Sequence, residues 1–446
     1  MPTKLHKEIS QYLLKHKKSK VCIDSRLLKE GDIFIALKGE QVHGNDFIST
    51  CIKKKAAFII ADTKVKSIKH KTVHGSKNPE KFLWDLGKRM RSESQATFIA
   101  ITGSNGKTTT KDILHSLLNS DSKTLKTQGN LNNLLGVPLT LSSLKPHHKY
   151  AIIECGTNQP GEIEQLCKLV KPDLSVITSI NAAHLSGLKN VHGIAKEKAN
   201  IFNIHPHHIF LREEDTQYPP IKQATKDHEH TFFDREGDLN IIKSLSSTKA
   251  ITWLYKKQKF VIDSPAIHNA LNAQAAIRIS EYLKVPLKTL SNRLKKWKSE
   301  KHRMCLVQWK KRNIIDDSYN ANPASVKEAV KTAARIKQKP KQHFFMVFGN
   351  MNEMGSRTNA HHKDLGKVFA EKGVDVLLTI GEKAKMSIQP FSKSGGKTSR
   401  HFENMLDLVQ FLKIFTQPHD VILIKGSRSM KMENIIDHIS KKATNV

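Results

Sequence analysis

The chain has 446 residues, a length that predicts roughly three domains at about 150 residues each. A hydrophobic share of 38% beside 26% charged residues is enough, at this length, to bury a core, which excludes a wholly disordered chain. The formal charge of +33 raises nucleic acid or a membrane surface as partners. The excess is spread along the chain, however, with +11 in residues 1–94 and +13 in residues 301–446. A nucleic-acid footprint is a patch, stripe or tail, so we favour a generally basic surface.

Cysteine usage and the absence of apolar runs indicate the compartment. The cysteines are odd in number, widely spaced and without a CxxC pair, which predicts free thiols in a reducing environment. No apolar run approaches the roughly 18 residues of a membrane span, and the start of the chain lacks the apolar core of a signal peptide. We therefore expect a cytoplasmic protein without membrane insertion. The five cysteines are Cys22, Cys51, Cys155, Cys167 and Cys305.

Several of the 23 histidines are clustered, as at His205, His207 and His208. No HExxH motif or paired Cys/His spacing accompanies them, as a zinc site would require. We interpret these three histidines as part of a solvated loop.

The first 94 residues show short β-like runs at residues 32–37 and 57–61, separated by glycine and charged turns. A polar helix is expected near residues 79–92. This pattern predicts a small α/β domain over residues 1–94.

Residues 95–300 begin with a buried strand at residues 96–102, a glycine turn and a helix with an apolar face. Further apolar strands at residues 150–154 and 174–178 alternate with helical stretches. The alternation predicts a mostly parallel, doubly wound sheet in the largest domain.

Residues 301–446 restart the alternation, with strands expected at residues 313–316, 344–348, 374–380 and 421–424. They predict a Rossmann-like C-terminal domain. The fold class is thus α/β in three domains, with an active site in a cleft between domains.

The strand-to-helix turn at residues 102–110 reads TGSNGKTTT. Backbone N–H groups of such a turn and the helix N-terminus can hold phosphate anions, which makes the loop an ATP-binding candidate. Lys107 is expected to reach the β- and γ-phosphates, and the Thr108 hydroxyl to bind Mg²⁺. The loop is shorter than GxxxxGK[ST], because Ile101 stands where the first glycine is usual. The other candidate nucleotide contacts in the loop are Gly103, Ser104, Asn105, Gly106 and Thr109.

This short loop resembles that of the Mur ligases, the ATP-dependent amide ligases of peptidoglycan synthesis, and the resemblance extends over nearly the whole chain. It is strongest to the branch that adds D-alanyl-D-alanine, and no Asp-Asn-Pro-Arg segment of the branch that adds a diamino acid occurs. The segments that carry the resemblance are DSR at 24–26, GDIFIALKG at 31–39, GNLNNLLGVP at 129–138, ECGTN at 154–158, AHLSG at 183–187, DDSYNANP at 316–323 and KGSRSM at 425–430.

The resemblance implies a catalytic and metal-binding group. Glu154 ends a strand and His184 follows another, where doubly wound sheets place ligand groups, and the family holds a second Mg²⁺ there. Lys198 matches a lysine that many Mur ligases carbamylate, which turns a cation into an anionic Mg²⁺ ligand. The catalytic candidates are therefore Lys107, Glu154, His184 and Lys198, and the metal candidates are Thr108, Glu154, His184 and carbamylated Lys198.

The resemblance also implies substrate contacts outside the loop. Ser25 and Arg26 are expected to bind the UDP part, although Arg26 could instead form a structural pair with an aspartate. An Asn-rich turn is the alternative interpretation for residues 130–133, and a solvated turn for the acidic pair at 316–317. The candidates for ATP are Asn269, Asn272, Arg303, Asp317 and Tyr319, and those for the other substrates are Ser25, Arg26, Asn130, Asn132, Asn133, Asn320 and Asn322.

Three positions depart from the family pattern. Ser186 replaces an acidic residue after Ala-His-Leu, and His302 replaces a glycine before Arg303. Asn350 stands where aspartate is usual in the segment FGNMNEMG, which puts the role of that carboxylate in doubt.

The implied reaction is phosphorylation of the terminal carboxylate of UDP-MurNAc-tripeptide by ATP, followed by attack of the D-Ala-D-Ala amine on the acyl phosphate. UDP-MurNAc-pentapeptide, ADP and phosphate would result. We expect a cytoplasmic monomer that supplies peptidoglycan precursors for cell-wall growth, shape and division. The sequence leaves open whether the third stem residue is meso-diaminopimelate or lysine. The alternatives are another Mur-type or folylpolyglutamate-type ligase with a different acceptor, and a P-loop ATPase that binds nucleic acid.

Overall fold

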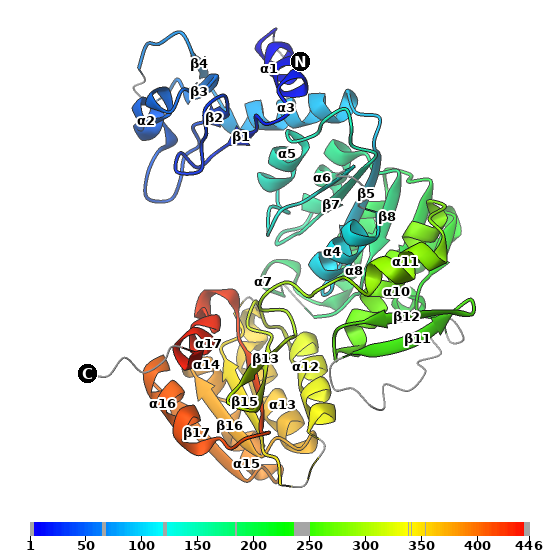
Figure 1. Ribbon diagram of the computed structural model, residues 1–446, viewed down its shortest axis with the longest axis vertical. Coiled ribbons are helices and arrows are strands. Elements are labelled where there is room, and N and C mark those ends of the chain that lie inside the picture. Colours follow the sequence, from blue (N-terminus) through cyan, green and yellow to red (C-terminus); the bar gives the residue numbers. More distant parts are fainter. Residues whose placement is uncertain are drawn as a thin grey trace.

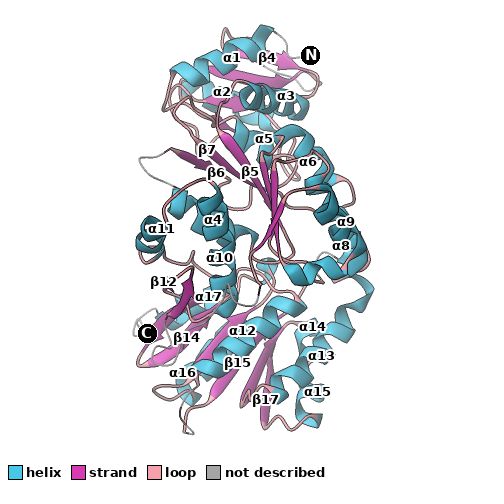
Figure 2. Cartoon of the chain, turned by 90° about the vertical axis from the view of Figure 1, so that its right-hand side faces the viewer, coloured by secondary structure: helices cyan, strands magenta, loops and turns pink. Residues whose placement is uncertain are grey.

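The computed structural model describes residues 4–64, 68–118, 123–182, 185–235, 250–337, 339, 341–352 and 354–440. Three parts, each built around a β-sheet, follow one another along the long axis of the molecule, with the N-terminal and C-terminal parts at opposite ends (Figure 1). Helices flank the sheets of the central and C-terminal parts, as the view turned by 90° shows (Figure 2). Among the described residues, no helix combines the length and the apolar character needed to cross a membrane.

The N-terminal part has a parallel four-stranded sheet in the order β1-β2-β3-β4. Its last helix begins at Pro79, because proline and a capping asparagine both favour a helix start. The Asn78 side chain accepts a hydrogen bond from Lys81 N. The elements are α1 (Lys4–Lys15), β1 (Val21–Cys22), β2 (Ile33–Ile35), η1 (Gly44–Phe47), α2 (Ile48–Lys53), β3 (Phe58–Asp62), β4 (Val73–Ser76) and α3 (Pro79–Ser92).

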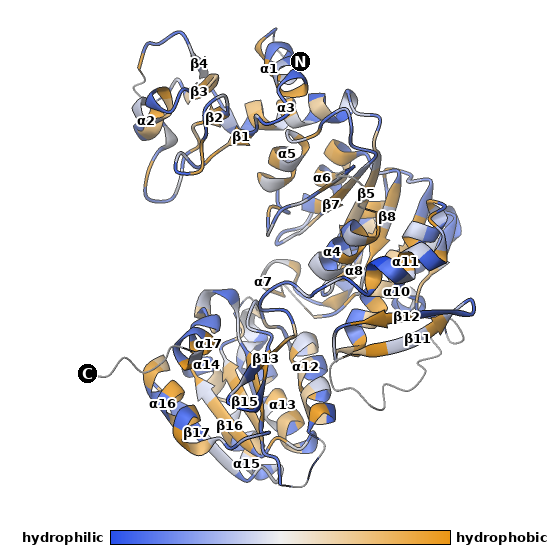
Figure 3. Ribbon diagram, viewed as in Figure 1, coloured by the Kyte–Doolittle hydropathy of each residue, from blue (hydrophilic) through white to orange (hydrophobic). Residues whose placement is uncertain are grey.

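The central part has a parallel six-stranded sheet in the order β10-β9-β8-β5-β7-β6. Its strands β5, β7 and β8 are mostly apolar (Figure 3), as strands covered on both faces must be. The elements are β5 (Thr97–Thr102), α4 (Lys107–Leu118), β6 (Thr124–Lys126), α5 (Gly136–Leu141), β7 (Tyr150–Glu154), α6 (Glu162–Val170), β8 (Leu174–Ile177), α7 (Leu185–Leu188), α8 (Val191–Ala199), η2 (Asn200–Phe202), β9 (His208–Leu211), η3 (Glu213–Gln217), α9 (Pro219–Asp227), β10 (His230–Phe232), the antiparallel pair β11 (Ile251–Tyr255) and β12 (Gln258–Ile262), α10 (Ile267–Tyr282) and α11 (Leu287–Leu294).

The C-terminal part has a six-stranded sheet in the order β13-β14-β18-β15-β16-β17, in which only the pair β13–β14 is antiparallel. The elements are β13 (Cys305–Trp309), β14 (Arg312–Asp316), α12 (Pro323–Ile336), β15 (Phe344–Gly349), η4 (Gly355–Arg357), α13 (Thr358–Glu371), β16 (Val376–Ile380), α14 (Glu382–Lys385), α15 (Ile388–Lys393), β17 (Thr398–Phe402), α16 (Met405–Phe415), β18 (Val421–Lys425), η5 (Arg428–Met430) and α17 (Glu433–Ser440).

One apolar core continues from the N-terminal part into the central part. Buried residues of α1 and β2, such as Ile9 and Ile33, belong to the same cluster as Phe98 of β5. Helix α3 lies against α5 so closely that a Cβ on Gly87 would be 2.9 Å from the Pro138 Cα. The C-terminal part forms apolar clusters of its own, to which the central part contributes Ala266.

Polar contacts reinforce the junction between the N-terminal and central parts. The Lys145 ammonium is buried and donates to the carbonyls of Leu13 at 2.6 Å and Ser19 at 3.0 Å. Arg91 donates to the Val170 carbonyl at 2.6 Å, and its guanidinium lies 3.7 Å from the centre of the Phe98 ring. The two parts therefore form one packed unit.

The expected α/β fold class is confirmed, with parallel sheets in all three parts. All five cysteines are free, as expected. The interpretation of the histidine cluster as a solvated loop is wrong for His208, which begins β9, is 9% exposed and bonds the Thr231 hydroxyl of the neighbouring β10 at 2.8 Å. His205 and His207 are exposed.

Candidate active site

The turn between β5 and α4 lies at the switch point of the central sheet, because β5 has β7 on one side and β8 on the other. Doubly wound sheets bind ligands at such a point. Both glycines of the turn have positive φ, +151° at Gly103 and +84° at Gly106. A Cβ at Gly103 would lie 2.0 Å from Thr178 Oγ1, and one at Gly106 would lie 2.4 Å from Asn272 Oδ1. Only glycine fits at these two positions.

Hydrogen bonds to β8 and the loop after it hold the turn in shape. The Thr178 hydroxyl donates to the Asn105 carbonyl at 2.6 Å, and the Ser104 hydroxyl donates to the Asn181 carbonyl at 2.7 Å. The Lys107 ammonium folds back and donates to the Gly103 carbonyl at 2.7 Å. Thr109 lies in the first turn of α4, half-buried. The turn is thus a preformed anion-binding loop with a cation at its mouth.

Glu154 is the buried acid of the site, 1% exposed at the end of β7. Its Oε1 accepts from the Thr108 hydroxyl at 3.2 Å and from the Asn132 amide at 2.8 Å. Its Oε2 has no hydrogen-bond partner among the described residues and lies 3.4 Å from the ammonium of Lys111. A buried carboxylate needs positive charge nearby, and this lysine supplies it.

Lys111 is a site residue that the sequence analysis missed. It lies on α4, four residues after Lys107, and its side chain is 1% exposed between Glu154 and Asp112. A lysine at i+4 from the loop lysine, on the apolar face of α4, was the available signal. Asp112 in turn accepts from Lys126 at 2.6 Å, so the acids and lysines form one buried network.

The donor set around Glu154 fits Mg²⁺. A hydroxyl and a carboxylate are the hard oxygen ligands that this ion takes, and Glu154 Oε2, which has an ion pair with Lys111 but no hydrogen bond, could also bind a metal ion. His184 lies outside the described residues, so its expected place beside Glu154 stays a prediction.

Lys198 is buried on α8, with 1% of its surface exposed. Burial, and then the neighbouring charge of Lys107, lower the pKa of its amine well below the usual lysine value. A neutral amine is the form that can add carbon dioxide, so this environment favours carbamylation. The resulting anion would relieve the repulsion from Lys107.

The Asn269 and Asn272 side chains are both buried on α10. Asn272 lies against Gly106 of the loop, and its contact with ATP stays a prediction. The Asn269 amide donates to the Ser264 hydroxyl at 2.8 Å. Asn269 thereby holds the start of α10 in place, whereas Asn272 contacts the loop.

The C-terminal part contributes two contacts to the phosphate loop. Arg303 Nη2 donates to Thr108 Oγ1 at 3.2 Å, and its guanidinium lies 3.9 Å from the centre of the Tyr319 ring. The Asn322 amide donates to Asn105 Oδ1 at 2.7 Å. Arg303, Tyr319 and Asn322 are therefore brought to the loop.

The Asp317 carboxylate accepts from the Lys425 ammonium, which also donates to the Asn320 carbonyl at 2.9 Å. The acidic pair is therefore held in a structured turn rather than a solvated one. The Asn320 side chain bonds the neighbouring Ala321 N–H at 2.9 Å.

The residues expected to contact the UDP-sugar are divided between two places. Arg26 is 86% exposed and pairs with Asp24 at 2.7 Å, and Ser25 is buried beneath Lys54, which donates to its carbonyl at 2.8 Å. Asn132 reaches Glu154, as described above. The Asn133 Oδ1 accepts from the N–H of Gly136, the first residue of α5, at 2.8 Å, and Asn130 is exposed.

Three family descriptions match successive stretches of the chain: "Mur ligase family, catalytic domain" over residues 19–83, "Mur ligase middle domain" over residues 101–280 and "Mur ligase, glutamate ligase domain" over residues 302–428. A curated relative from Buchnera aphidicola, named UDP-N-acetylmuramoyl-tripeptide–D-alanyl-D-alanine ligase, is 30% identical over 95% of this chain and 94% of its own length. The chain belongs to the Mur ligase family.

Two solved structures extend this similarity to the arrangement of all three parts. A MurF structure from Acinetobacter baumannii is 28% identical to this Mur ligase and superposes with a TM-score of 0.84 over 98% of both chains. The MurF ligase of Thermotoga maritima in complex with ADP shares the fold, with a TM-score of 0.80, 24% identity and coverage of 95% of this chain and 97% of its own.

In this Mur ligase, the Asn350 side chain accepts a backbone hydrogen bond that a carboxylate could also accept. Its Oδ1 accepts from Ala384 N at 2.9 Å, at the start of α14, and its side chain lies against Gly381, where a Cβ would be 2.6 Å away. A helix N-terminus needs an acceptor, and an amide oxygen serves as well as a carboxylate. The departure at Asn350 therefore keeps the cap and removes only the charge.

His302, which precedes Arg303, has a φ of +68°. This is the left-handed region, which the glycine usual in the family adopts without strain. The His302 Nδ1 lies 2.8 Å from Asp316 Oδ2. In place of the flexible glycine between the central and C-terminal parts, this Mur ligase has a histidine whose side chain contacts Asp316. The side chain of Ser186, the third departure, is outside what the structure describes.

Proposed function

We propose that the protein joins D-alanyl-D-alanine to UDP-MurNAc-tripeptide at the expense of ATP, giving UDP-MurNAc-pentapeptide, ADP and phosphate. It would act as an acid–amino-acid ligase in peptidoglycan precursor synthesis, and so serve cell-wall growth, cell shape and division. We further propose that it works as a monomer in the cytoplasm.

The observation that carries the proposal is the similarity over 95% of the chain to a relative named for this reaction. The phosphate loop with Lys107, the buried Glu154 and the arginine from the C-terminal part supply the chemistry that such a reaction needs. A carboxylate is a poor acyl donor because its leaving group is oxide, so phosphorylation must come first.

In the first step, a carboxylate oxygen of the tripeptide attacks the γ-phosphorus of ATP, and ADP leaves. The loop N–H groups and Lys107 would hold the phosphates, and Arg303 would reach the transferring phosphoryl group from the opposite side. Asn269, Asn272, Asp317 and Tyr319 would hold the rest of the nucleotide, with Asp317 acting through its pair with Lys425. Both cations would offset charge that builds up in the transition state.

In the second step, the free amine of D-Ala-D-Ala attacks the carbonyl carbon of the acyl phosphate, phosphate leaves, and the amine gives up a proton. Asn320 and Asn322 lie where they could orient this acceptor. The contact between Asn322 and Asn105 would bring the acceptor and nucleotide together and help exclude water, which otherwise hydrolyses the acyl phosphate.

Mg²⁺ would be held by Thr108 and Glu154, and at a second position by Glu154, His184 and carbamylated Lys198. When bound, the ion supplies Lewis-acid stabilisation of charge on the phosphoryl oxygens. The protein's own contribution is the fixed placement of these oxygens by β7 and α4.

We assign the UDP-MurNAc part to residues 1–94, ATP to residues 95–300 and the acceptor to residues 301–446. Ser25 and Arg26 would bind the diphosphate of the UDP. To do so, Arg26 would break its exposed ion pair with Asp24 and pair with the diphosphate instead. The turn between the N-terminal part and Glu154 would also contact this substrate, through Asn130, Asn132 and Asn133.

The deciding test is D-Ala-D-Ala-dependent release of ADP with UDP-MurNAc-tripeptide as donor. Lys107→Ala is expected to lower the rate by about 10²–10³-fold or more, because a placed cation is lost. Lys288→Ala, which removes an exposed lysine on α11, is the matched control and should retain the wild-type rate. Substantial ligation by the Lys107→Ala enzyme would contradict the proposed site.

A panel of amino acids and dipeptides tests the acceptor. D-Ala-D-Ala should be used in preference to single amino acids and to glutamate. Preference for another acceptor would reassign the enzyme to another Mur-type or folylpolyglutamate-type ligase. ADP release that nucleic acid stimulates, with no ligation, would support the nucleic-acid ATPase instead.

A further inference from the structure

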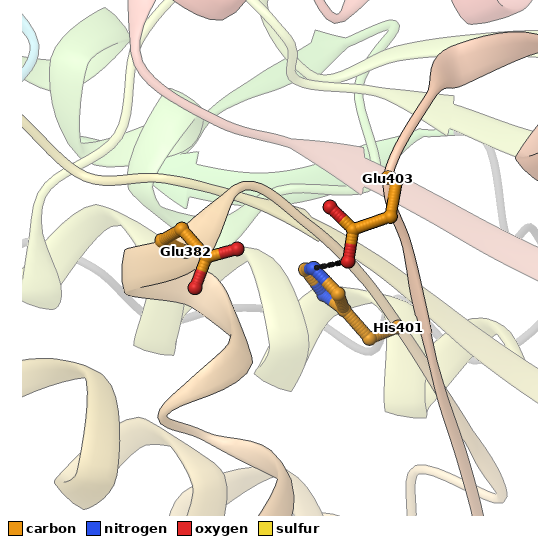
Figure 4. A group of neighbouring side chains, drawn as sticks. All are labelled: Glu382, His401 and Glu403. Carbon is orange, nitrogen blue, oxygen red and sulfur yellow. Dashed lines mark ion pairs between the residues drawn. The ribbon is translucent and has the colours of Figure 1, made fainter.

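Three side chains outside the nucleotide site converge at the carboxyl edge of the C-terminal sheet (Figure 4). Glu382 is the first residue of α14, directly after the Gly381 turn that ends β16. His401 lies on β17, and Glu403 follows that strand by one residue. One ligand atom from each of the three lies within 4.8 Å of the others.

The strand geometry explains why the side chains meet. His401 and Glu403 are two residues apart, so they lie on the same side of the sheet. β16 and β17 run parallel with Thr379 opposite His401, which places Glu382 next to the end of β17. The cluster is therefore a product of the sheet register.

His401 is oriented by a hydrogen bond on one side of its ring, and on the side that faces the acids it has an ion-pair contact but no hydrogen bond. Its side chain is 10% exposed, and its Nδ1 lies 2.9 Å from the hydroxyl of the buried Thr379. Its Nε2 is buried and has no hydrogen-bond partner among the described residues, and the nearest acid, Glu403 Oε1, is 3.5 Å away. When the Nδ1–H donates to Thr379, the Nε2 lone pair faces the two carboxylates, an arrangement that a bound cation would stabilise.

The negative charge of the two glutamates also favours a bound cation. The C-terminal 146 residues hold 26 basic and 13 acidic side chains, and Glu382 and Glu403 are two acids that the fold brings together. Carboxylates this close repel each other unless a cation lies between them. Glu403 is 75% exposed and Glu382 is exposed, so solvent ions have access and both side chains can adjust.

We infer that Glu382, His401 and Glu403 form a binding site for a zinc-class divalent cation, held by one imidazole nitrogen and two carboxylates. Imidazole with carboxylate suits Zn²⁺ better than Mg²⁺, which avoids nitrogen ligands. Three protein ligands leave the fourth tetrahedral position to water, as exposure of the site allows. The Thr379 hydroxyl holds the His401 ring in place through Nδ1, the nitrogen that faces away from the cation.

The site would tie the start of α14 to the end of β17. The residue after Glu382, Lys383, donates to Asn352 at 2.9 Å, and Asn350 caps the same helix. Bound Zn²⁺ would therefore order the loop after β15 as well as α14. Its effect is on the C-terminal part and is independent of the Mg²⁺ that ATP requires.

The test is Zn²⁺ binding to the full-length protein, freed of metal by chelator and measured by equilibrium dialysis in excess Mg²⁺. Glu382→Gln and Glu403→Gln are each expected to lower the affinity of one site at least tenfold, as loss of a ligand charge should. Glu371→Gln removes an exposed carboxylate at the end of α13 and is the matched control, with unchanged binding. All three positions are exposed, so the variants should fold.

Two further results bear on the inference. Crystals soaked in Zn²⁺ should show an anomalous peak among the three side chains, and Zn²⁺ should slow hydrogen exchange in α14. Equal Zn²⁺ binding by the wild type and both glutamine variants would overturn the inference. So would an NMR titration in which the His401 ring is an imidazolium paired with Glu403 and is unchanged by Zn²⁺.

Discussion

The Asn322 side chain donates a 2.7 Å hydrogen bond to the Asn105 side chain, although 217 positions separate the two residues. The same Asn322 accepts from Ser325 N at 2.9 Å and so caps α12. One side chain therefore stabilises its own helix and joins the C-terminal part to the phosphate loop.

These two roles of Asn322 can be separated by substitution. Serine also caps helices but is too short to reach Asn105, so Asn322→Ser should keep its thermal stability while the KM for ATP rises about two- to tenfold, the worth of one hydrogen bond. Asn322→Ala should show the same rise in KM and also lose about 1 kcal/mol in the free energy of unfolding. Equal kinetics of the serine variant and the wild type would show that the bridge is irrelevant to ATP binding.

Glu154→Gln should abolish ligation and destabilise the protein. The substitution leaves the buried Lys111 ammonium with Asp112 at 3.8 Å as its remaining partner, and breaking a buried pair costs about 3–5 kcal/mol. Adding Lys111→Met should restore most of the stability without restoring activity. Urea unfolding and ADP release measure the two effects. Recovery of activity in the double variant would contradict the assigned role of Glu154.

Asp215 should make the protein less stable as pH rises from about 4 to about 7. Burial raises the pKa of its carboxyl to about 7, and its Oδ2 has no hydrogen-bond partner among the described residues. Because the folded state holds the proton more tightly than the unfolded state, stability is greatest below the ordinary aspartate pKa and falls between about pH 4 and pH 7.

The neutral variant Asp215→Asn should remove this dependence. At pH 8 it should be more stable than the wild type by up to roughly 4 kcal/mol, and at pH 4 the two should unfold alike. Thermal unfolding at both pH values is the measurement. A constant difference between the two proteins at all pH values would count against a buried, protonated Asp215.

Asn350→Asp, which restores the family residue, should leave ligation within about twofold of the wild type. An aspartate oxygen can accept from Ala384 N in the same way, and a negative charge at a helix N-terminus is worth about 0.3–1 kcal/mol. Asn350→Ala should lose the cap and about 1 kcal/mol of stability. A large gain of activity in Asn350→Asp would mean that the missing charge, rather than the cap, is what matters.

The sequence predicts β5, β7 and β8 of the central sheet and the inner strands of the C-terminal sheet, because strands covered on both faces are continuous apolar runs. It does not predict the outer strands β6, β9 and β10 of the central sheet. It does not predict β17, whose residues Thr-Ser-Arg-His-Phe are mostly polar. An edge strand has only one neighbour and needs no apolar run. The antiparallel β11–β12 pair, whose buried residues alternate, was also not predicted.

Within the site, the sequence identifies candidates at the ends of strands and at the start of α4, and it misses a residue further along the helix. Lys107, Thr108 and Glu154 follow from motif and strand position. Lys111 does not, because a lysine on a helix is an ordinary surface residue until its helix is packed. The contact between Arg303 and Thr108 depends on how two sheets face each other, which no local pattern encodes.

The shared core between Ile9, Ile33 and Phe98 has a consequence for how the molecule comes apart. Calorimetry should resolve two cooperative transitions rather than three, because the first sheet packs one face on the shared core, although its other face has a small apolar cluster of its own. The C-terminal part, with its own clusters, melts alone. The first two sheets are therefore expected to move as one rigid body.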